Sequence, residues 1–296
     1  MKQWMLWTAV ALIVVVALAG TFSHRVAVRD ETERSDGDPM RLISLAPNVT
    51  EILFELRLGG EVVGVSTACS YPPEAEQIPT VGDLAAPDLE LVQALRPDLV
   101  ITTGFRDPEV KQALETAGVR VLTVNQSSLE DVVTAVGMIG RATGCERRAA
   151  RYARTLRGRI ERATVDLPES ERPRVFVELS PQPLSTGAEG TFLDDLIRRA
   201  GGRNIAHDMS KPWTRISPDT VVARDPQIII VAYPMKGDPQ ERLANRIGWG
   251  RVSAVRDGWV VGSIDRDLLL RPGPRLVDGL EALANLLRRY RAQEAK

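Results

Sequence analysis

Two stretches of the chain follow one pattern. Residues 89–101 (LELVQALRPDLVI) align without gaps with residues 218–230 (PDTVVARDPQIII). In each stretch an acidic residue, Glu90 or Asp219, begins a short helical pattern, a proline ends it, and an apolar strand-like run follows. Strand-like runs alternate with helical stretches around both segments, which is typical of a mostly parallel sheet covered by helices. We therefore predict an α/β fold with two Rossmann-like lobes of related build.

The strand-like runs also set the limits of the predicted lobes. The first lobe, residues 41–142, contains such runs at 41–45, 62–65, 99–102 and 119–124. The second lobe, residues 169–296, contains them at 175–179, 227–232 and 259–262. Near the start of the first lobe, Asn48 is a good helix N-cap with Glu51 at the third helical position.

A long helical pattern separates the two lobes. Residues 145–165 contain no proline and a single glycine, Gly158, and their apolar residues recur at steps of three and four. A helix of about 20 residues spans about 30 Å. We therefore predict that residues 143–168 form a single long helix that bridges the lobes, with a ligand cleft between them. An ordinary surface helix is the alternative interpretation.

The N-terminal segment predicts export. Residues 1–22 contain a nearly continuous apolar run that fits a signal peptide or a membrane anchor, and Ala17-Leu18-Ala19 matches a cleavage pattern. Residues 23–40 include RDETERSDGD, which has no apolar residue and reads as a charged linker. Cleavage and anchoring both remain open, and both place the folded part outside the cytoplasm. Export permits a disulfide between Cys69 and Cys145, which sequence alone does not establish.

Composition and motifs give little support for an enzyme. The 38 basic and 39 acidic residues leave a net charge of −1, which argues against a nucleic-acid-coating protein. Only His24 and His207 are histidines, so we predict no catalytic residues, no metal site and no cofactor. His207 is expected to be structural. Asp194 and Asp195 are adjacent on a predicted helix and do not face each other.

Aromatic and charged residues gather in three predicted loops that follow strands. They are residues 70–73 (SYPP), 211–214 (KPWT) and 265–275 (DRDLLLRPGPR). In open α/β sheets, ligands bind at the carboxyl ends of the strands. Aromatic faces with a few charged groups suit a large, flat, amphipathic ligand.

These pieces resemble a known family. The segments RLISLAPNVTEILF, VGVSTACSYPPEA, KPWTRIS and RPGPRLVDGLEALANLL, with the repeated pair, are similar to substrate-binding proteins of ABC importers for vitamin B12, iron-siderophores and haem. The resemblance covers residues 41–287, and SYPPEA with RPGPR is most similar to the cobalamin branch. It implies an exported protein, expected to be a monomer, that captures a corrinoid and delivers it to an ABC permease and its ATPase.

The resemblance also implies roles for individual residues. Tyr71 and Trp213 match positions that pack against the corrin ring. Asp267 and Arg271 match polar contacts near the nucleotide side of the ligand, although the two could simply pair on the surface. Glu90 and Asp219, one in each lobe, match acidic residues that dock on arginines of the permease. Alternatively, the two carboxylates are there because the helix dipole stabilises negative charge at a helix start.

The ligand stays open at this point. Leu84 replaces an aromatic residue of the vitamin B12 protein, so cobalamin and the smaller cobinamide are both candidates. Tyr233, His207 and Met209 keep haem as an alternative, because haem capture needs an axial ligand. A ferric siderophore is a further alternative. A membrane-tethered sensor or enzyme that uses the same fold is the hypothesis from another class.

Overall fold

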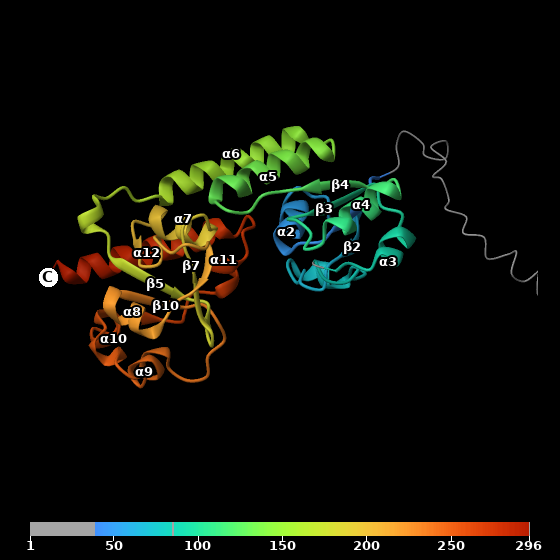
Figure 1. Ribbon diagram of the computed structural model, residues 1–296. Helices are drawn as coiled ribbons and strands as arrows, with labels where there is room; N and C mark the ends of the chain where they lie inside the picture. The colour runs from blue at the N-terminus through green and yellow to red at the C-terminus, as the bar shows by residue number, and fades with distance from the viewer. Residues whose placement is uncertain (1–38, 85, 296) are drawn as a thin grey trace, which may run out of the picture. The chain divides into compact units, whose positions relative to one another are not determined.

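The computed structural model describes residues 39–84 and 86–295 (Figure 1). The predicted signal peptide or anchor, residues 1–22, lies outside this part, as does nearly all of the predicted linker, residues 23–40. Within the described part, no helix combines the length and the apolar character needed to cross a membrane.

The first lobe is built on a four-stranded parallel sheet. Its strands are β1 (Leu42–Ser44), β2 (Val62–Val65), β3 (Leu99–Thr102) and β4 (Arg120–Thr123), in the order β2-β1-β3-β4. The helices α2 (Pro47–Glu55), α3 (Leu89–Ala94) and α4 (Pro108–Thr116) lie between successive strands. This is the strand–helix alternation that the sequence predicts.

The second lobe repeats this sheet and adds a small one. Its parallel strands are β5 (Arg174–Glu178), β8 (Arg203–Asn204), β10 (Ile228–Val231) and β11 (Val260–Val261), in the order β11-β10-β5-β8. Its helices are α7 (Phe192–Arg199), α8 (Pro218–Arg224), α9 (Pro239–Ala244) and α10 (Ser253–Arg256). The antiparallel strands β6 (Ser180–Pro181), β7 (Leu184–Gly187) and β9 (Trp213–Arg215) form the added sheet. Matching β1 with β5 and β3 with β10 gives both lobes the same strand order.

The repeat extends to individual hydrogen bonds. At the start of β1, the Arg41 N–H donates to Asp98 Oδ2 at 2.7 Å, and the Asp98 N–H donates to the Arg41 carbonyl at 2.8 Å. At the start of β5, the Arg174 N–H donates to Gln227 Oε1 at 3.0 Å, and the Gln227 N–H donates to the Arg174 carbonyl at 2.8 Å. We call these two matched pairs the strand clamps. They support the prediction that the lobes have related build.

Arg96 and Asp225, at matching places before the clamps, share an uncommon backbone. Each precedes a proline, and their φ angles are +44° and +43°. Burial raises the pKa of the Asp225 carboxyl, but hydrogen bonds from the Ser253 N–H and hydroxyl, together with Arg174, outweigh it and hold the pKa below its ordinary value. Asp225 therefore ties α10 to β5.

A pair of helices joins the lobes. The helices α5 (Leu129–Ala142) and α6 (Glu146–Ala163) lie side by side along their length (Figure 1). A Cβ on Gly140 would lie 2.2 Å from the Ala149 Cβ, so only glycine permits this approach. The predicted bridging helix, residues 143–168, is continuous but shorter, from Glu146 to Ala163. The helix α5, which the sequence analysis did not identify, packs against it. The lobe limits 41–142 and 169–296 stay predictions.

Two C-terminal helices complete the second lobe. They are α11 (Arg266–Leu270) and α12 (Leu276–Glu294), and α12 packs against α6 and α7. Arg159 of α6 donates to Glu281 at 2.9 and 2.8 Å and to Asp278 at 2.5 Å, which ties α6 to α12. Short 3₁₀ turns occur at Gly59–Glu61, Pro73–Gln77, Glu169–Glu171 and Trp249–Arg251.

The central strands of each parallel sheet, β1 and β3 in the first and β5 and β10 in the second, are buried on both faces. Along β1, Leu42 belongs to a large apolar cluster that also includes α5, α6 and α12, whereas Ile43 belongs to a cluster on the opposite face. Along β5, Val175 and Phe176 divide in the same way between the large cluster and a second-lobe cluster. Successive strand residues point to opposite faces, so continuous apolar runs are what a doubly covered sheet requires.

Two details differ from the sequence analysis or resolve what it left open. Asn48 is not the N-cap of the first helix: Ala46 takes that place without a side-chain bond, and α2 begins at Pro47. Proline suits the first helical position because its fixed φ is helical and its missing N–H is not needed there. Cys69 and Cys145 are both buried, unpaired thiols, so no disulfide joins them.

Candidate ligand-binding site

Tyr71 lies in the loop after β2 of the first lobe. Its side chain is 39% exposed, which is unusual for a large apolar ring in this chain. The guanidinium of Arg275, from the second lobe, lies 3.6 Å from the centre of the Tyr71 ring. One side of the ring is therefore held by a cation–π contact, and the side chain still keeps exposed surface for a ligand.

Arg275 also reaches a buried acid of the first lobe. Its Nη2 donates to Glu51 Oε1 at 2.6 Å, and Glu51 on α2 is only 2% exposed. A Cβ on Gly273 would lie 2.9 Å from Glu51 Oε2 and 3.2 Å from the Asn48 Cα. Residues 271–275, which we call the RPGPR loop, therefore pack directly against the start of α2.

Asp267 and Arg271 lie beside this contact. Arg271 Nη2 is 3.3 Å from Asp267 Oδ2 and donates to Ser70 Oγ at 3.1 Å. The predicted surface pair therefore exists, and Arg271 also reaches the residue next to Tyr71. The expectation that residues 265–275 form one loop was wrong, because residues 266–270 form α11 with Asp265 as its N-cap.

Several charged atoms of the cluster are buried. Burial raises the pKa of the Glu51 carboxyl, even though Arg275 acts to lower it. Glu51 Oε2, Arg275 Nε and Arg271 Nη1 are buried and have no hydrogen-bond partner among the described residues. Charged groups in such surroundings interact strongly with one another, and losing one partner is costly.

Trp213 presents an aromatic surface on the second lobe. It is 48% exposed, and its ring packs on Phe192 with the ring centres 5.1 Å apart. Trp213 is the first residue of β9 and pairs with Gly187 of β7, so its predicted place in a loop was wrong. No described contact joins Trp213 to Tyr71. The expectation that both rings touch one ligand therefore stays a prediction.

Glu90 and Asp219 occupy equivalent positions. Each is the second residue of its helix, α3 or α8, and each is exposed. Capping is done by other residues, since Asp88 accepts from the Glu90 N–H at 3.0 Å and Ser217 accepts from the Thr220 N–H at 3.0 Å. The helix dipole favours both carboxylates, which leaves their predicted docking role compatible with their position.

Two of the residues considered as haem ligands, His207 and Tyr233, contact buried acids. His207 Nδ1 lies 3.1 Å from both oxygens of the buried Asp194, in keeping with its expected structural role. The Tyr233 hydroxyl donates to Glu178 Oε1 at 2.6 Å, and Arg246 donates to both Glu178 oxygens at 2.7 Å. Burial, and then Glu178, raise the pKa of the Tyr233 phenol.

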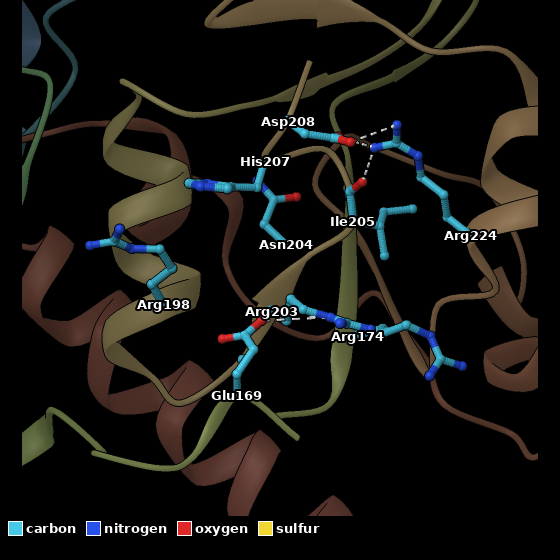
Figure 2. Close-up of a pocket in the computed structure, with 10 residues that line it drawn as sticks. Glu169, Arg174, Arg198, Arg203, Asn204, Ile205, His207, Asp208 and Arg224 are labelled. Carbon is cyan, nitrogen blue, oxygen red and sulfur yellow. Dashed lines mark hydrogen bonds and ion pairs between the residues drawn. The ribbon is translucent and has the colours of Figure 1, made fainter. Parts of the chain in front are cut away.

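Two open hollows lie on the second lobe. Figure 2 shows the larger one, of about 590 Å³, where Arg224 donates to Asp208 and to the Ile205 carbonyl. Its other lining residues are Glu169, Arg174, Arg198, Gly202, Arg203, Asn204 and His207. The second, of about 460 Å³, lies beyond the carboxyl ends of β10 and β11 and includes Tyr233 and Met235. The residues predicted to bind a corrinoid line neither hollow, whereas the candidate haem ligands His207 and Tyr233 line one each.

Metal-binding groups are also sparse. Within residues 39–84 and 86–295, no group of three or more histidine, cysteine, aspartate or glutamate side chains could hold a metal ion. Asp194 and Asp195 point to different partners: Asp194 to Asn204 and His207, Asp195 to Arg199 and the Leu129 N–H. The prediction that they do not face each other agrees with these contacts.

Sequence reasoning missed Glu51 and Arg275 as site residues. The two are 224 positions apart, so no local spacing connects them. The available signal was the RPGPR loop itself, in which two arginines flank a rigid Pro-Gly-Pro segment. Arginines fixed in this way are good candidates for ion pairs with an acidic residue.

Comparison with known proteins agrees with this architecture. The family model described as periplasmic binding protein matches residues 42–263. A vitamin B12-binding protein of Salmonella paratyphi A (strain ATCC 9150 / SARB42) is 32% identical over 249 residues, covering 83% of this chain and 90% of that protein. The uncharacterized ABC transporter substrate-binding lipoprotein YvrC of Bacillus subtilis (strain 168) is 32% identical over 255 residues, covering 83% and 79%.

Among solved structures, the periplasmic heme-binding protein RhuT from Roseiflexus sp. RS-1, in apo form, superposes with a TM-score of 0.73 at 26% identity. The match covers 86% of this chain and 100% of that one. A family match across both parallel sheets, relatives at 32% identity and a shared fold lead to one conclusion: this chain belongs to the periplasmic binding protein family.

Proposed function

We propose that this protein captures a corrinoid, cobalamin or cobinamide, and delivers it to an ABC import permease. Family membership makes it an exported, substrate-binding transport protein, as the apolar N-terminal run and the motifs predicted. The family consists of binding proteins rather than enzymes, so no catalytic residue is assigned.

The observation that carries the corrinoid proposal is the grouping around Tyr71. Arg275 contacts this exposed aromatic ring, and Arg271, which pairs with Asp267, donates to Ser70 next to Tyr71 in the chain. A corrin is a broad apolar ring system with amide groups at its edge, so it can stack on the Tyr71 ring while its polar edge meets Arg271 and Asp267. Trp213 supplies a second exposed ring from the other lobe. The vitamin B12-binding relative at 32% identity supports the same assignment.

The haem alternative fits this chain less well. A haem protein of this kind holds the iron through a side-chain atom such as a histidine nitrogen or a tyrosine oxygen. Here the hydroxyl of Tyr233 donates to Glu178. The contact of His207 with Asp194 involves Nδ1 and does not occupy Nε2, so His207 stays a candidate axial ligand. A raised phenol pKa also works against the phenolate that iron prefers. Because one solved relative is a heme-binding protein, the titration described below includes haemin.

Delivery would use the two equivalent carboxylates. Glu90 and Asp219 are exposed at matching helix starts, one on each lobe. A permease formed by two subunits can offer one arginine to each, and such charge-assisted pairs are directional. The relative named as an ABC transporter substrate-binding lipoprotein supports a permease and its ATPase as partners.

Calorimetric titration tests the ligand assignment. The purified chain would be titrated with cyanocobalamin, cobinamide, haemin and a ferric hydroxamate siderophore. We expect binding of at least one of the two corrinoids, and weaker or no binding of haemin. The variant Tyr233→Phe serves as a control, because it should leave corrinoid binding unchanged. Preference for haemin or the siderophore would reject the corrinoid, and failure to bind any of the four would favour a sensor or enzyme.

A further inference from the structure

Arg275 is inserted between two groups of the opposite lobe. Its guanidinium donates to Glu51 of α2 at 2.6 Å and lies 3.6 Å from the ring centre of Tyr71. Both partners belong to the first lobe, whereas Arg275 is the N-cap residue of α12 in the second. A single side chain therefore connects the backbone frame of the second lobe to an aromatic ring of the first.

The arginine is held from a stiff frame. Pro272 and Pro274 restrict the RPGPR loop, and Gly273 allows it to approach Glu51 and Asn48. Beyond Arg275, the long helix α12 is tied to α6 through Arg159. Little freedom is left for the guanidinium to move away from the Tyr71 ring.

The chemistry of the contact requires arginine. The edge of a planar guanidinium can bond a carboxylate while its face stacks on an aromatic ring. A lysine ammonium has no planar face, so it cannot reproduce both contacts. Glu51 is almost fully buried, and without Arg275 its charge would have no described ion-pair partner.

We propose that Arg275 is a positioning residue that fixes the Tyr71 ring for the ligand, with Glu51 fixing Arg275 in turn. We call Glu51, Arg275 and Tyr71 the interlobe latch. The proposal rests on the proposed function in assuming that Tyr71 contacts the corrinoid. Arg275 itself acts through Tyr71.

A double-mutant cycle separates positioning from general damage. Arg275→Lys should weaken cyanocobalamin binding about 10-fold in the otherwise native chain, the scale set by losing one cation–π contact and the order of the ring. In the Tyr71→Ala background, the same change should alter affinity less than about 2-fold. A loss of equal size in both backgrounds would overturn the positioning role.

A second measurement needs no ligand. The chain contains 4 tyrosines, so labelling with 3-fluorotyrosine gives few ¹⁹F NMR signals, and Tyr71→Phe identifies the one from Tyr71. Arg275→Lys and the milder Glu51→Gln should both shift this signal and broaden it. The matched control Arg159→Lys alters a different arginine–carboxylate contact, between α6 and α12, and should leave the Tyr71 signal in place.

The two failures are distinguishable. If the native chain binds neither cyanocobalamin nor cobinamide, the corrinoid proposal fails, while the ¹⁹F signals still test the latch. If the Tyr71 signal is the same in Arg275→Lys, Glu51→Gln and the native chain, the latch is rejected even for a corrinoid binder. Glu51→Gln keeps the shape of the acid, so it provides a folded variant if Arg275→Lys does not fold.

Discussion

Truncating Trp213 to alanine should weaken corrinoid binding by about 10-fold to 100-fold. The ring packs on Phe192 on one side, and 48% of the residue surface remains exposed to a ligand. A tryptophan offers about 250 Å² in total, so about 120 Å² is available. At about 25 cal/mol per Å², full coverage is worth about 3 kcal/mol and half coverage about 1.5 kcal/mol. Each 1.4 kcal/mol is a factor of ten in affinity.

The assay is calorimetric titration of Trp213→Ala with cyanocobalamin and cobinamide. Trp213→Phe is the matched control, since it keeps an aromatic face and should lose less than half of the binding free energy that alanine loses. Thermal unfolding of each variant separates the lost contact with Phe192 from lost ligand contact. If Trp213→Ala binds both corrinoids within about 2-fold of the native chain while remaining folded, Trp213 is not in the pocket.

Three further predictions concern docking, pH and the joint between the lobes. Replacing Glu90 and Asp219 together with alanine should weaken association with the permease and leave corrinoid affinity intact, as measured by pull-down and calorimetry on the same protein; unchanged association would reject the docking role. Because the pKa of Asp225 is lowered in the folded state, its ionised form stabilises the fold above the ordinary value of 3.8, and this contribution is lost as pH falls through the folded pKa. Asp225→Asn tolerates the left-handed backbone and should flatten the acid limb of a urea-unfolding series; an unaltered limb would contradict the assignment. Gly140→Val should cost about 1–3 kcal/mol of stability, because the larger side chain pushes α5 away from Ala149. In the native chain, small-angle scattering should change little on binding ligand, because the helices that join the lobes resist bending. A large compaction would show that these helices bend.

The fold was accessible from the sequence because its signals are local. The aligned segments 89–101 and 218–230 contain helix starts, proline stops and apolar strands within a few residues of one another. In the structure these become α3 with β3 and α8 with β10, in sheets of the same strand order. Local periodicity is sufficient for such elements, because each strand is buried on both faces and each helix has its own beginning and end.

The site was accessible only in part because its contacts are not local. Tyr71, Asp267 and Arg271 were predicted through motifs, but the bond between Glu51 and Arg275 joins distant positions with no shared pattern. Trp213 was assigned to a loop because its strand pairs with β7, which has no counterpart in the first lobe. Asn48 was taken as a cap because a polar residue before a helical run usually is one, yet Pro47 had already begun the helix.

The two ends of each parallel sheet differ in how freely their sequence can change, because the strand clamps hold only one end. Both clamps sit where β1 and β5 begin, whereas Tyr71 follows the carboxyl end of β2 and the added strands β6, β7 and β9 follow β5. The second lobe has these added strands and still has a clamp of the same geometry, with the amide of Gln227 in place of the acid of Asp98. Such a scaffold can be redirected to a new cargo by exchanging the segments at one end, without redesign of the other. We expect grafts of residues 180–187 and 213–215 between relatives to transfer ligand preference while the sheet, and its unfolding temperature, stay nearly constant.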